Sequence, residues 1–142
     1  MKLGIIRCEE TAKRCGGWNC FPSIRDLTGN FSVYDGIDLV GFLTCGGCGQ
    51  GKTDKVLEKA KYLKQHGAEV IHLGNCLASG CPYRRKYAGA LRKAGYNIVE
   101  RTHPSATPEQ QAHFREIMKA RKKEAARKKA FLIAHGFTVD ED

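Results

Sequence analysis

The chain has 142 residues and a mass of 15.7 kDa, and its 42% hydrophobic content is enough to build the single core expected at this length. No apolar run approaches the length that spans a membrane, and the start lacks a signal-peptide cleavage pattern, so we expect a soluble, cytoplasmic protein. Net charge is +9, which permits an anionic partner without naming one.

The predicted elements alternate between strands and helices. Helix ends are marked by Gly67 and Gly95, which supply the left-handed residue that terminates a helix. This alternation predicts an α/β fold with an open, mostly parallel sheet of about four strands flanked by helices. In chain order the predicted elements are a strand at 2–7, a short helix at 21–27, a strand at 37–43, a helix at 53–66, a strand at 69–73, a helix at 82–94 and a strand at 96–100.

The segment from 103 to 108 has the composition of a linker, and Thr107 is predicted to cap the helix that follows. We therefore divide the chain into an α/β domain at 1–103 and a linker with a basic C-terminal helix at 104–142. The basic run of this helix lacks interleaved aromatic side chains for base stacking, which argues against nucleic-acid binding. Its apolar end at 130–134 offers a surface for a partner protein or a second copy of the chain.

Seven cysteines dominate the chemistry of the chain, and each lies at the end of a predicted strand or in the loop beyond it. An odd number of cysteines in a reducing compartment favours metal binding or thiol chemistry over structural disulfides. The carboxyl ends of parallel strands meet at one edge of a sheet, so these loops should converge there. The sequence-ordered groups are Cys8, Cys15 and Cys20 after the first strand, Cys45 and Cys48 after the second, Cys76 and Cys81 after the third, and His103 after the fourth.

Thiolates and imidazole are the ligands of zinc, and four thiolates can also hold an iron–sulfur cluster. We expect the inner ligands to be the cysteines that come first after each strand, because the backbone is most constrained there. The alternative is that the thiols are packed in the core as small hydrophobes. The predicted inner ligands are Cys8, Cys45, Cys48 and Cys76, with Cys81 and His103 as further candidates and Cys15 and Cys20 as satellites.

Several separated motifs together resemble the CGGC-domain family over residues 2 to 103. They are the start at 2–8, the Cys15 and Cys20 pair, the run 40–48 that ends in Cys-Gly-Gly-Cys, the run 67–82 with its two cysteines, and the Thr102-His103 ending. The resemblance implies a metal site, because that family is described as metal-binding on account of its many cysteines and histidines. The resemblance does not indicate an enzyme reaction. Family members often carry glycine where this chain has Arg101, which leaves the role of His103 open.

A phosphate-binding pattern occupies the same loop. Residues 46–53 satisfy G-x-x-x-x-G-K-[ST] between a strand and a helix, so Gly46, Gly51, Lys52 and Thr53 are the candidate residues for a nucleotide phosphate. No predicted strand ends in the aspartate that usually orients magnesium. In the alternative interpretation the glycines serve the metal loop, Lys52 is solvated and Thr53 caps the helix.

Thiol–disulfide exchange is a third interpretation of the Cys-Gly-Gly-Cys loop. A C-x-x-C pair before a helix usually exposes its first thiol and lowers the pKa of that thiol, which would make Cys45 the attacking group and Cys48 its resolving partner. An exchanger needs two cysteines, whereas this chain supplies sulfur from three loops. Two classes of function thus remain: a metal-binding module that holds zinc or an iron–sulfur cluster, and an enzyme.

Overall fold

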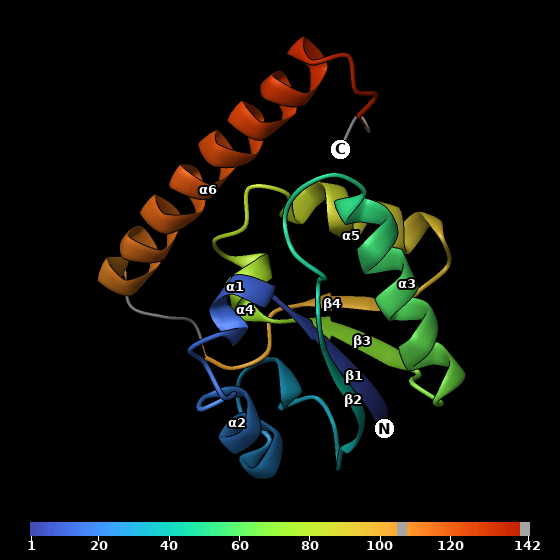
Figure 1. Cartoon of the computed structure of the whole chain (residues 1–142). Coiled ribbons are helices and arrows are strands. Elements are labelled where there is room, and N and C mark those ends of the chain that lie inside the picture. The colour runs from blue at the N-terminus through green and yellow to red at the C-terminus, as the bar shows by residue number, and fades with distance from the viewer. Residues whose placement is uncertain (105–107, 140–142) are drawn as a thin grey trace.

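Residues 1–104 and 108–139 are described by the computed structural model, without side-chain detail for 108–115, 117, 118 and 121. At the centre is a four-stranded sheet in the order β2-β1-β3-β4, in which every neighbouring pair is parallel (Figure 1). This confirms the predicted α/β class and the strand count. The strands are β1 (Lys2–Arg7), β2 (Asp38–Thr44), β3 (Val70–Leu73) and β4 (Ile98–Glu100).

Helices cover both faces of this sheet. On one face α3 (Lys52–Gln65) and α5 (Arg84–Lys93) pack on a core that includes Ile6, Ile71 and Leu91. On the other face α2 (Cys20–Asp26) and the short 3-10 helix η1 (Gly29–Phe31) enclose a smaller core of Leu3, Ile5, Phe31 and Val70. Burial of both faces explains why the strands are continuous apolar runs rather than alternating ones.

Close approach of α3 to the sheet depends on two glycines in adjacent strands. A Cβ atom at Gly4 would lie 2.8 Å from the Leu63 methyl carbons, and one at Gly41 would also collide with Leu63. Leu63 is 2% exposed, so its side chain fills the space that these glycines leave. The two glycines therefore set the distance between the helix layer and the β1–β2 pair.

An irregularity in β2 determines which side chains face each layer. Leu39 pairs with Leu3, but Gly41 pairs with Gly4, so Val40 is an extra residue without a partner in β1. Because of this bulge, Leu39 and Phe42 both join the core on the α2 face despite their odd spacing. Beyond it, Arg7 pairs with Thr44, and the residues that follow both strands begin level with each other.

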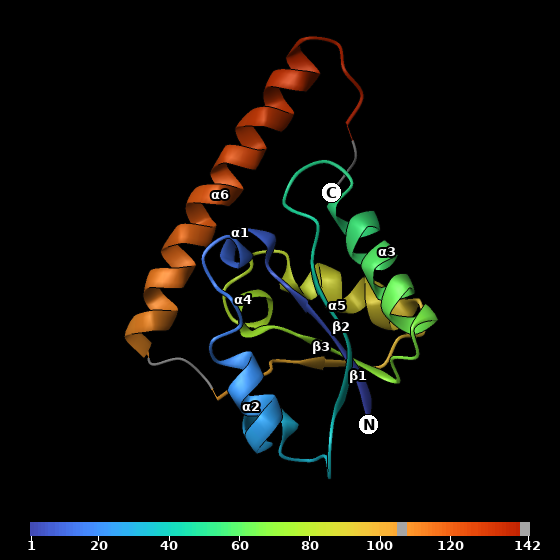
Figure 2. The same ribbon diagram turned by 60° about the horizontal axis from the view of Figure 1, so that its bottom comes forward.

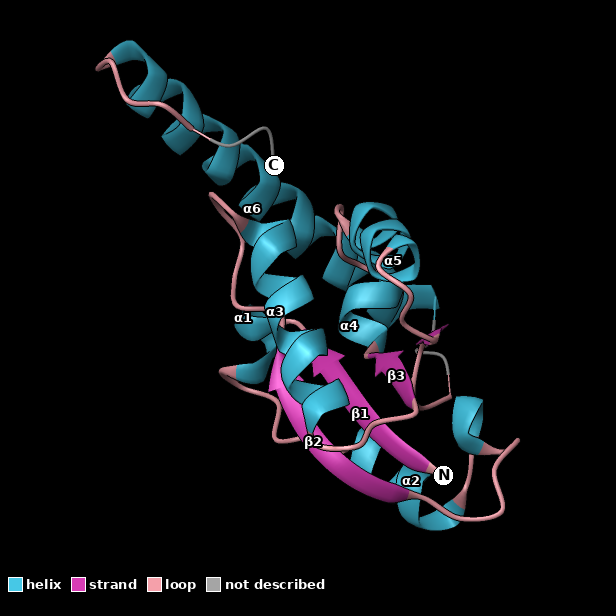
Figure 3. Cartoon of the chain, turned by 90° about the vertical axis from the view of Figure 1, so that its right-hand side faces the viewer, coloured by secondary structure: helices cyan, strands magenta, loops and turns pink. Residues whose placement is uncertain are grey.

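The carboxyl ends of the strands point toward two one-turn helices that the sequence did not predict, α1 (Glu9–Ala12) and α4 (Asn75–Ala78) (Figure 3). Each lies in a cysteine-bearing loop. The long helix α6 (Pro108–Ala134) extends beyond this edge of the sheet (Figures 1 and 2). The predicted cap Thr107 lies outside the described residues. Within 1–104 and 108–139, no helix combines the length and the apolar character needed to cross a bilayer.

Candidate functional site: a sulfur-rich sheet edge

Cys8 and Cys45 form the centre of the sulfur-rich edge. They directly follow the paired ends of β1 and β2, and the Cys45 N–H donates to the Arg7 carbonyl at 2.7 Å. The thiols of both residues are buried, with exposed fractions of 3% and 2%. Their side chains are joined by a hydrogen bond between the two thiols. We call these two residues the inner pair.

This contact separates the acidities of the two thiols. The hydrogen bond from Cys45 lowers the pKa of Cys8 to about 6, against the opposing effect of burial, and backbone N–H groups of Thr11 and Glu10 contribute further. The same bond is the main reason that the pKa of Cys45 is raised, and burial adds to it. The hydrogen bond therefore helps the pair as a whole to lose its first proton and opposes loss of the second.

The predicted assignment of a lowered pKa to Cys45 is wrong for this reason. Cys45 is buried rather than exposed, and its pKa is raised rather than lowered. The exposed member of the Cys-Gly-Gly-Cys loop is Cys48. The contact between Cys8 and Cys45 follows from the pairing of β1 with β2. The sequence did not indicate it, because the strand order was unknown.

Cys76 lies in α4, just after the end of β3, and is close to Cys8. The Cys8 N–H donates to the Cys76 sulfur at 3.1 Å. Burial raises the pKa of Cys76 to about 12, and the nearby thiols of Cys8, Cys20 and Cys15 raise it further. Because β1 is central in the sheet, its first loop residue contacts the cysteines that follow both flanking strands.

The remaining cysteines surround this centre. Burial raises the pKa of Cys81 to about 12, with smaller contributions from the neighbouring Cys48 and Cys8, and its sulfur accepts the Tyr83 N–H at 3.4 Å. Cys20 is buried against Thr102, with 3.3 Å between its sulfur and the threonine hydroxyl. Cys15 is half-buried, and its sulfur accepts the Gly17 N–H at 3.4 Å. All seven cysteines are free thiols.

His103 contacts a buried side chain, that of Asn75, which the sequence did not indicate. Asn75 is 8% exposed, accepts the Thr102 N–H at 2.8 Å and donates to the His103 carbonyl at 3.1 Å. The His103 ring contacts this same Asn75 amide and the Pro104 carbonyl. Asn75 thus joins the loops after β3 and β4. Its position directly before Cys76 was the available signal.

Arg101 occupies the position where the resemblance led us to expect glycine, and its backbone φ is 93°, in the left-handed region. The backbone is held there from both sides: the Arg101 N–H donates to Leu73, and the Arg101 carbonyl accepts the His72 Nδ1–H at 2.9 Å. Its guanidinium donates to the Ser79 hydroxyl at 2.9 Å.

This strained backbone yields a prediction. We expect R101G to be more stable than R101A by about 1 kcal/mol, which reverses the usual order of glycine and alanine, because only glycine adopts this φ freely. Both variants lose the bond to Ser79, so the comparison isolates the backbone. Urea unfolding of the two variants measures the difference, and an alanine variant equal to or more stable than the glycine variant would contradict it.

Lys52 and Thr53, which follow the loop from Gly46 to Gly51, do not have the roles expected if the glycines only serve a metal loop. Lys52 is 2% exposed and its Nζ lies 4.5 Å from the centre of the Tyr83 ring, so it is not the solvated lysine of the alternative interpretation. Gly51, with φ 72°, is the N-cap of α3, so Thr53 does not cap this helix either. The order strand, glycine loop, helix is as a phosphate loop requires.

The donor set fits a soft metal in chemistry but only partly in arrangement. Thiolates that accept backbone N–H bonds are typical ligands of zinc and of iron–sulfur clusters. Within the described part of the chain, however, no three His, Cys, Asp or Glu side chains are arranged to hold one ion. The inner pair supplies two ligands in contact, and a third would require a neighbouring thiol, such as Cys76 or Cys81, to rotate toward it.

Comparison with known proteins places this architecture in a family. The uncharacterized protein MJ0582 of Methanocaldococcus jannaschii is 40% identical over 91 residues, which cover 58% of this chain and 69% of that protein. None of the solved structures matches the chain. The sequence profile described as the CGGC domain matches residues 2–103, which contain the whole sheet and all seven cysteines. The chain therefore belongs to the CGGC domain family.

Proposed function

We propose that the chain binds a metal through thiolates at the carboxyl edge of the sheet, with the inner pair as the first two ligands. The observation that carries this proposal is the contact between Cys8 and Cys45, in which the pKa of Cys8 is lowered to about 6. A metal ion would take the place of the proton between the two sulfurs, and the lowered pKa of Cys8 makes that replacement easier. Membership of a cysteine-rich family supports the same function.

The remaining ligands come from the neighbouring loops. Cys76 and Cys81 are the next candidates, because Cys76 accepts the Cys8 N–H and Cys81 lies within electrostatic reach of Cys8. Four thiolates from these loops would close a tetrahedral zinc site or hold an iron–sulfur cluster. Cys48 is the most exposed of the predicted ligands, and His103 is directed at Asn75, so both are secondary candidates.

Anaerobic purification followed by elemental analysis and absorption spectroscopy tests this proposal. Stoichiometric zinc without colour is the result expected for a zinc site, and stoichiometric iron with charge-transfer absorption is the result expected for a cluster. Metal-free protein would then be titrated with zinc against a chromophoric chelator. A fresh preparation that contains neither metal, and that fails to compete for zinc when reduced, would overturn metal binding.

Thiol–disulfide exchange is the second candidate, and the same pair favours it. Two thiols joined by a hydrogen bond, one of them with a lowered pKa, have the arrangement of a reactive dithiol, and here they are Cys8 and Cys45 in place of the predicted Cys45 and Cys48 couple. Burial of both sulfurs restricts access by a protein substrate. Nucleotide binding at residues 46–53 has less support, because Lys52 is buried against Tyr83.

A titration of metal-free, reduced protein provides a prediction for the inner pair. We expect the pair to lose its first proton near pH 6, well below the 9.0 of an ordinary thiol, because the remaining proton on Cys45 stabilises the Cys8 thiolate. Thiolate ultraviolet absorbance measures this step. It should move to higher pH in C45A and persist in C15S. A wild-type titration without a step below pH 8 would contradict the prediction.

The free energy of unfolding should also change with pH as Cys8 loses its proton. Because the pKa of Cys8 is lower in the folded than in the unfolded chain, its contribution is complete above pH 9.0 and is lost as pH falls through about 6.

A further inference from the structure

Tyr87 has a buried hydroxyl that meets no hydrogen-bond partner in the part of the chain that the structure describes. The residue lies in α5 and is 1% exposed. Buried tyrosine hydroxyls usually find a partner, because an unmade hydrogen bond in the core leaves the loss of hydration uncompensated. The groups around this hydroxyl therefore indicate which acceptor it serves.

Three thiols lie within electrostatic reach of this hydroxyl. Tyr87 packs in the same core cluster as Cys8, Cys45 and Cys81. Burial raises the pKa of Tyr87, and Cys45, Cys81 and Cys48 raise it further, with the largest of these three effects from Cys45. Because electrostatic effects weaken with distance, Cys45 is the first candidate for an acceptor.

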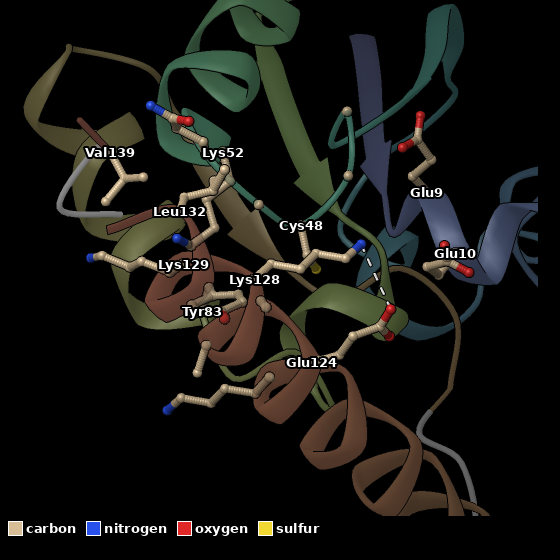
Figure 4. A pocket seen from close by; sticks show the side chains of 17 residues that line it. Glu9, Glu10, Cys48, Lys52, Tyr83, Glu124, Lys128, Lys129, Leu132 and Val139 are labelled. Carbon is tan, nitrogen blue, oxygen red and sulfur yellow. Dashed lines mark ion pairs between the residues drawn. The ribbon is translucent and has the colours of Figure 1, made fainter. Parts of the chain in front are cut away.

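A cavity of about 510 Å³ between the Cys-Gly-Gly-Cys loop and α6 does not reach Tyr87. Tyr83 lines this cavity together with Lys52 and Cys48 (Figure 4). Tyr83 comes one turn before Tyr87, and the centres of the two rings are 6.2 Å apart. Tyr87 does not belong to the lining, so water in the cavity does not contact its hydroxyl. The acceptor has to come from the core.

Cys45 needs a further hydrogen-bond donor if it is to serve as a metal ligand. It is 2% exposed, so a thiolate at this position is not hydrated. Hydrogen bonds from the backbone of Glu9 and Gly47 lower its pKa. The contact with Cys8 no longer supplies a donor once both thiols have given up their protons. Hydrogen bonds to a metal ligand orient it and tune its bond to the metal, and the Tyr87 hydroxyl can make one here.

We propose that Tyr87 is a positioning residue of the metal site, and that its hydroxyl donates a hydrogen bond to the Cys45 sulfur when Cys45 is a thiolate ligand. The inference rests on the proposed metal binding. The proton of Cys45 passes to solvent as the metal binds, and its sulfur becomes an acceptor. Tyr87 keeps its own proton throughout. The hydroxyl thus stabilises the loaded site rather than the fold.

Y87F keeps the ring and removes only the hydroxyl, so it tests this role directly. We expect zinc affinity, measured by competition with a chromophoric chelator, to fall about tenfold. In protein loaded with cobalt(II) in place of zinc, the sulfur-to-cobalt charge-transfer absorption should move to longer wavelength, because loss of a hydrogen bond raises the energy of the sulfur electrons. Without metal, Y87F should unfold at the same urea concentration as wild type or a higher one, since it loses an unpartnered group.

The matched control is Y34F. The Tyr34 hydroxyl has a partner, the His72 Nε2 at 2.7 Å, in the core on the other face of the sheet. We expect Y34F to unfold at a lower urea concentration with and without metal, and to leave zinc affinity within twofold and the cobalt spectrum unchanged. The two variants thus separate a role at the Cys45 sulfur from the structural role of a buried tyrosine.

Cysteine variants identify the acceptor. Y87F should have no further effect on zinc affinity in C45S, where the acceptor is gone, and should keep its effect in C76S. Three results would each overturn the role of Tyr87 and leave the metal site intact: zinc affinity of Y87F within twofold of wild type, a wild-type cobalt spectrum in Y87F, or a tenfold effect that persists in C45S. Wild-type protein that binds neither zinc nor cobalt would overturn the metal site itself.

Discussion

Serine in place of Cys8 is expected to weaken zinc binding by about 100-fold or more, because one of four thiolates supplies roughly a quarter of the binding free energy of a structural zinc site. Cys8 is central because its thiol shares a hydrogen bond with the Cys45 thiol and its N–H donates to the Cys76 sulfur. Its loss should also remove the thiolate that forms near pH 6. Competition with a chromophoric chelator measures the affinity.

The matched control for this variant is C20S. Cys20 is another buried cysteine at the same edge, but its sulfur contacts the Thr102 hydroxyl rather than the inner pair. We expect C20S to bind zinc within a few-fold of wild type. Circular dichroism establishes that both variants fold. Unchanged zinc affinity in folded C8S would remove the inner pair from the metal site and leave thiol chemistry as the better function.

Replacement of Leu63 by alanine is expected to have the largest effect on stability, about 3 kcal/mol, because it leaves a cavity between α3 and the β1–β2 pair. Leu63 is 2% exposed and covers both Gly4 and Gly41. G41A should also destabilise the protein, since a Cβ atom there collides with the leucine, at a cost of roughly 1–3 kcal/mol. G36A serves as the control, because a Cβ at Gly36 meets no atom within 4 Å.

The double variant G41A/L63A distinguishes this packing from a general intolerance of mutation. We expect its loss of stability to be smaller than the sum of the single losses, because the alanine methyl at position 41 occupies part of the space that Leu63 vacates. Urea unfolding of the four proteins in the cycle measures the coupling. Strictly additive losses would show that the two residues do not pack as the structure places them.

Most of the fold was predictable because both faces of the sheet are buried, so each strand is a short apolar run between glycine-terminated helices. The predicted strand at 2–7 coincides with β1, and the predicted helix at 53–66 differs from α3 by one residue at each end. The helices α1 and α4 were missed because a single turn of four residues has no measurable periodicity. They form where the cysteine loops leave the sheet.

The candidate site was predictable as a location but not as an arrangement. Strand ends in a parallel sheet meet at one edge whatever the strand order, which is why all seven cysteines gather there. Which thiols touch depends on the order β2-β1-β3-β4, and this order is decided by packing between distant segments. The burial of Lys52 was missed for the same reason, because its partner Tyr83 comes from the loop before α5.

The unpaired Val40 in β2 has a consequence for how this edge could vary. This extra residue shifts the register of β2 against β1 by one, so that side chains before and after it both face the correct side of the sheet. Deletion of Val40 would place Leu39 directly before Gly41 and close the bulge, so that Leu39 stays opposite Leu3 and Thr44 stays opposite Arg7 in an unbroken ladder. The bulge is therefore a point at which β2 can lose one residue while both the core side chains and the sulfurs at the end of the strand keep their places.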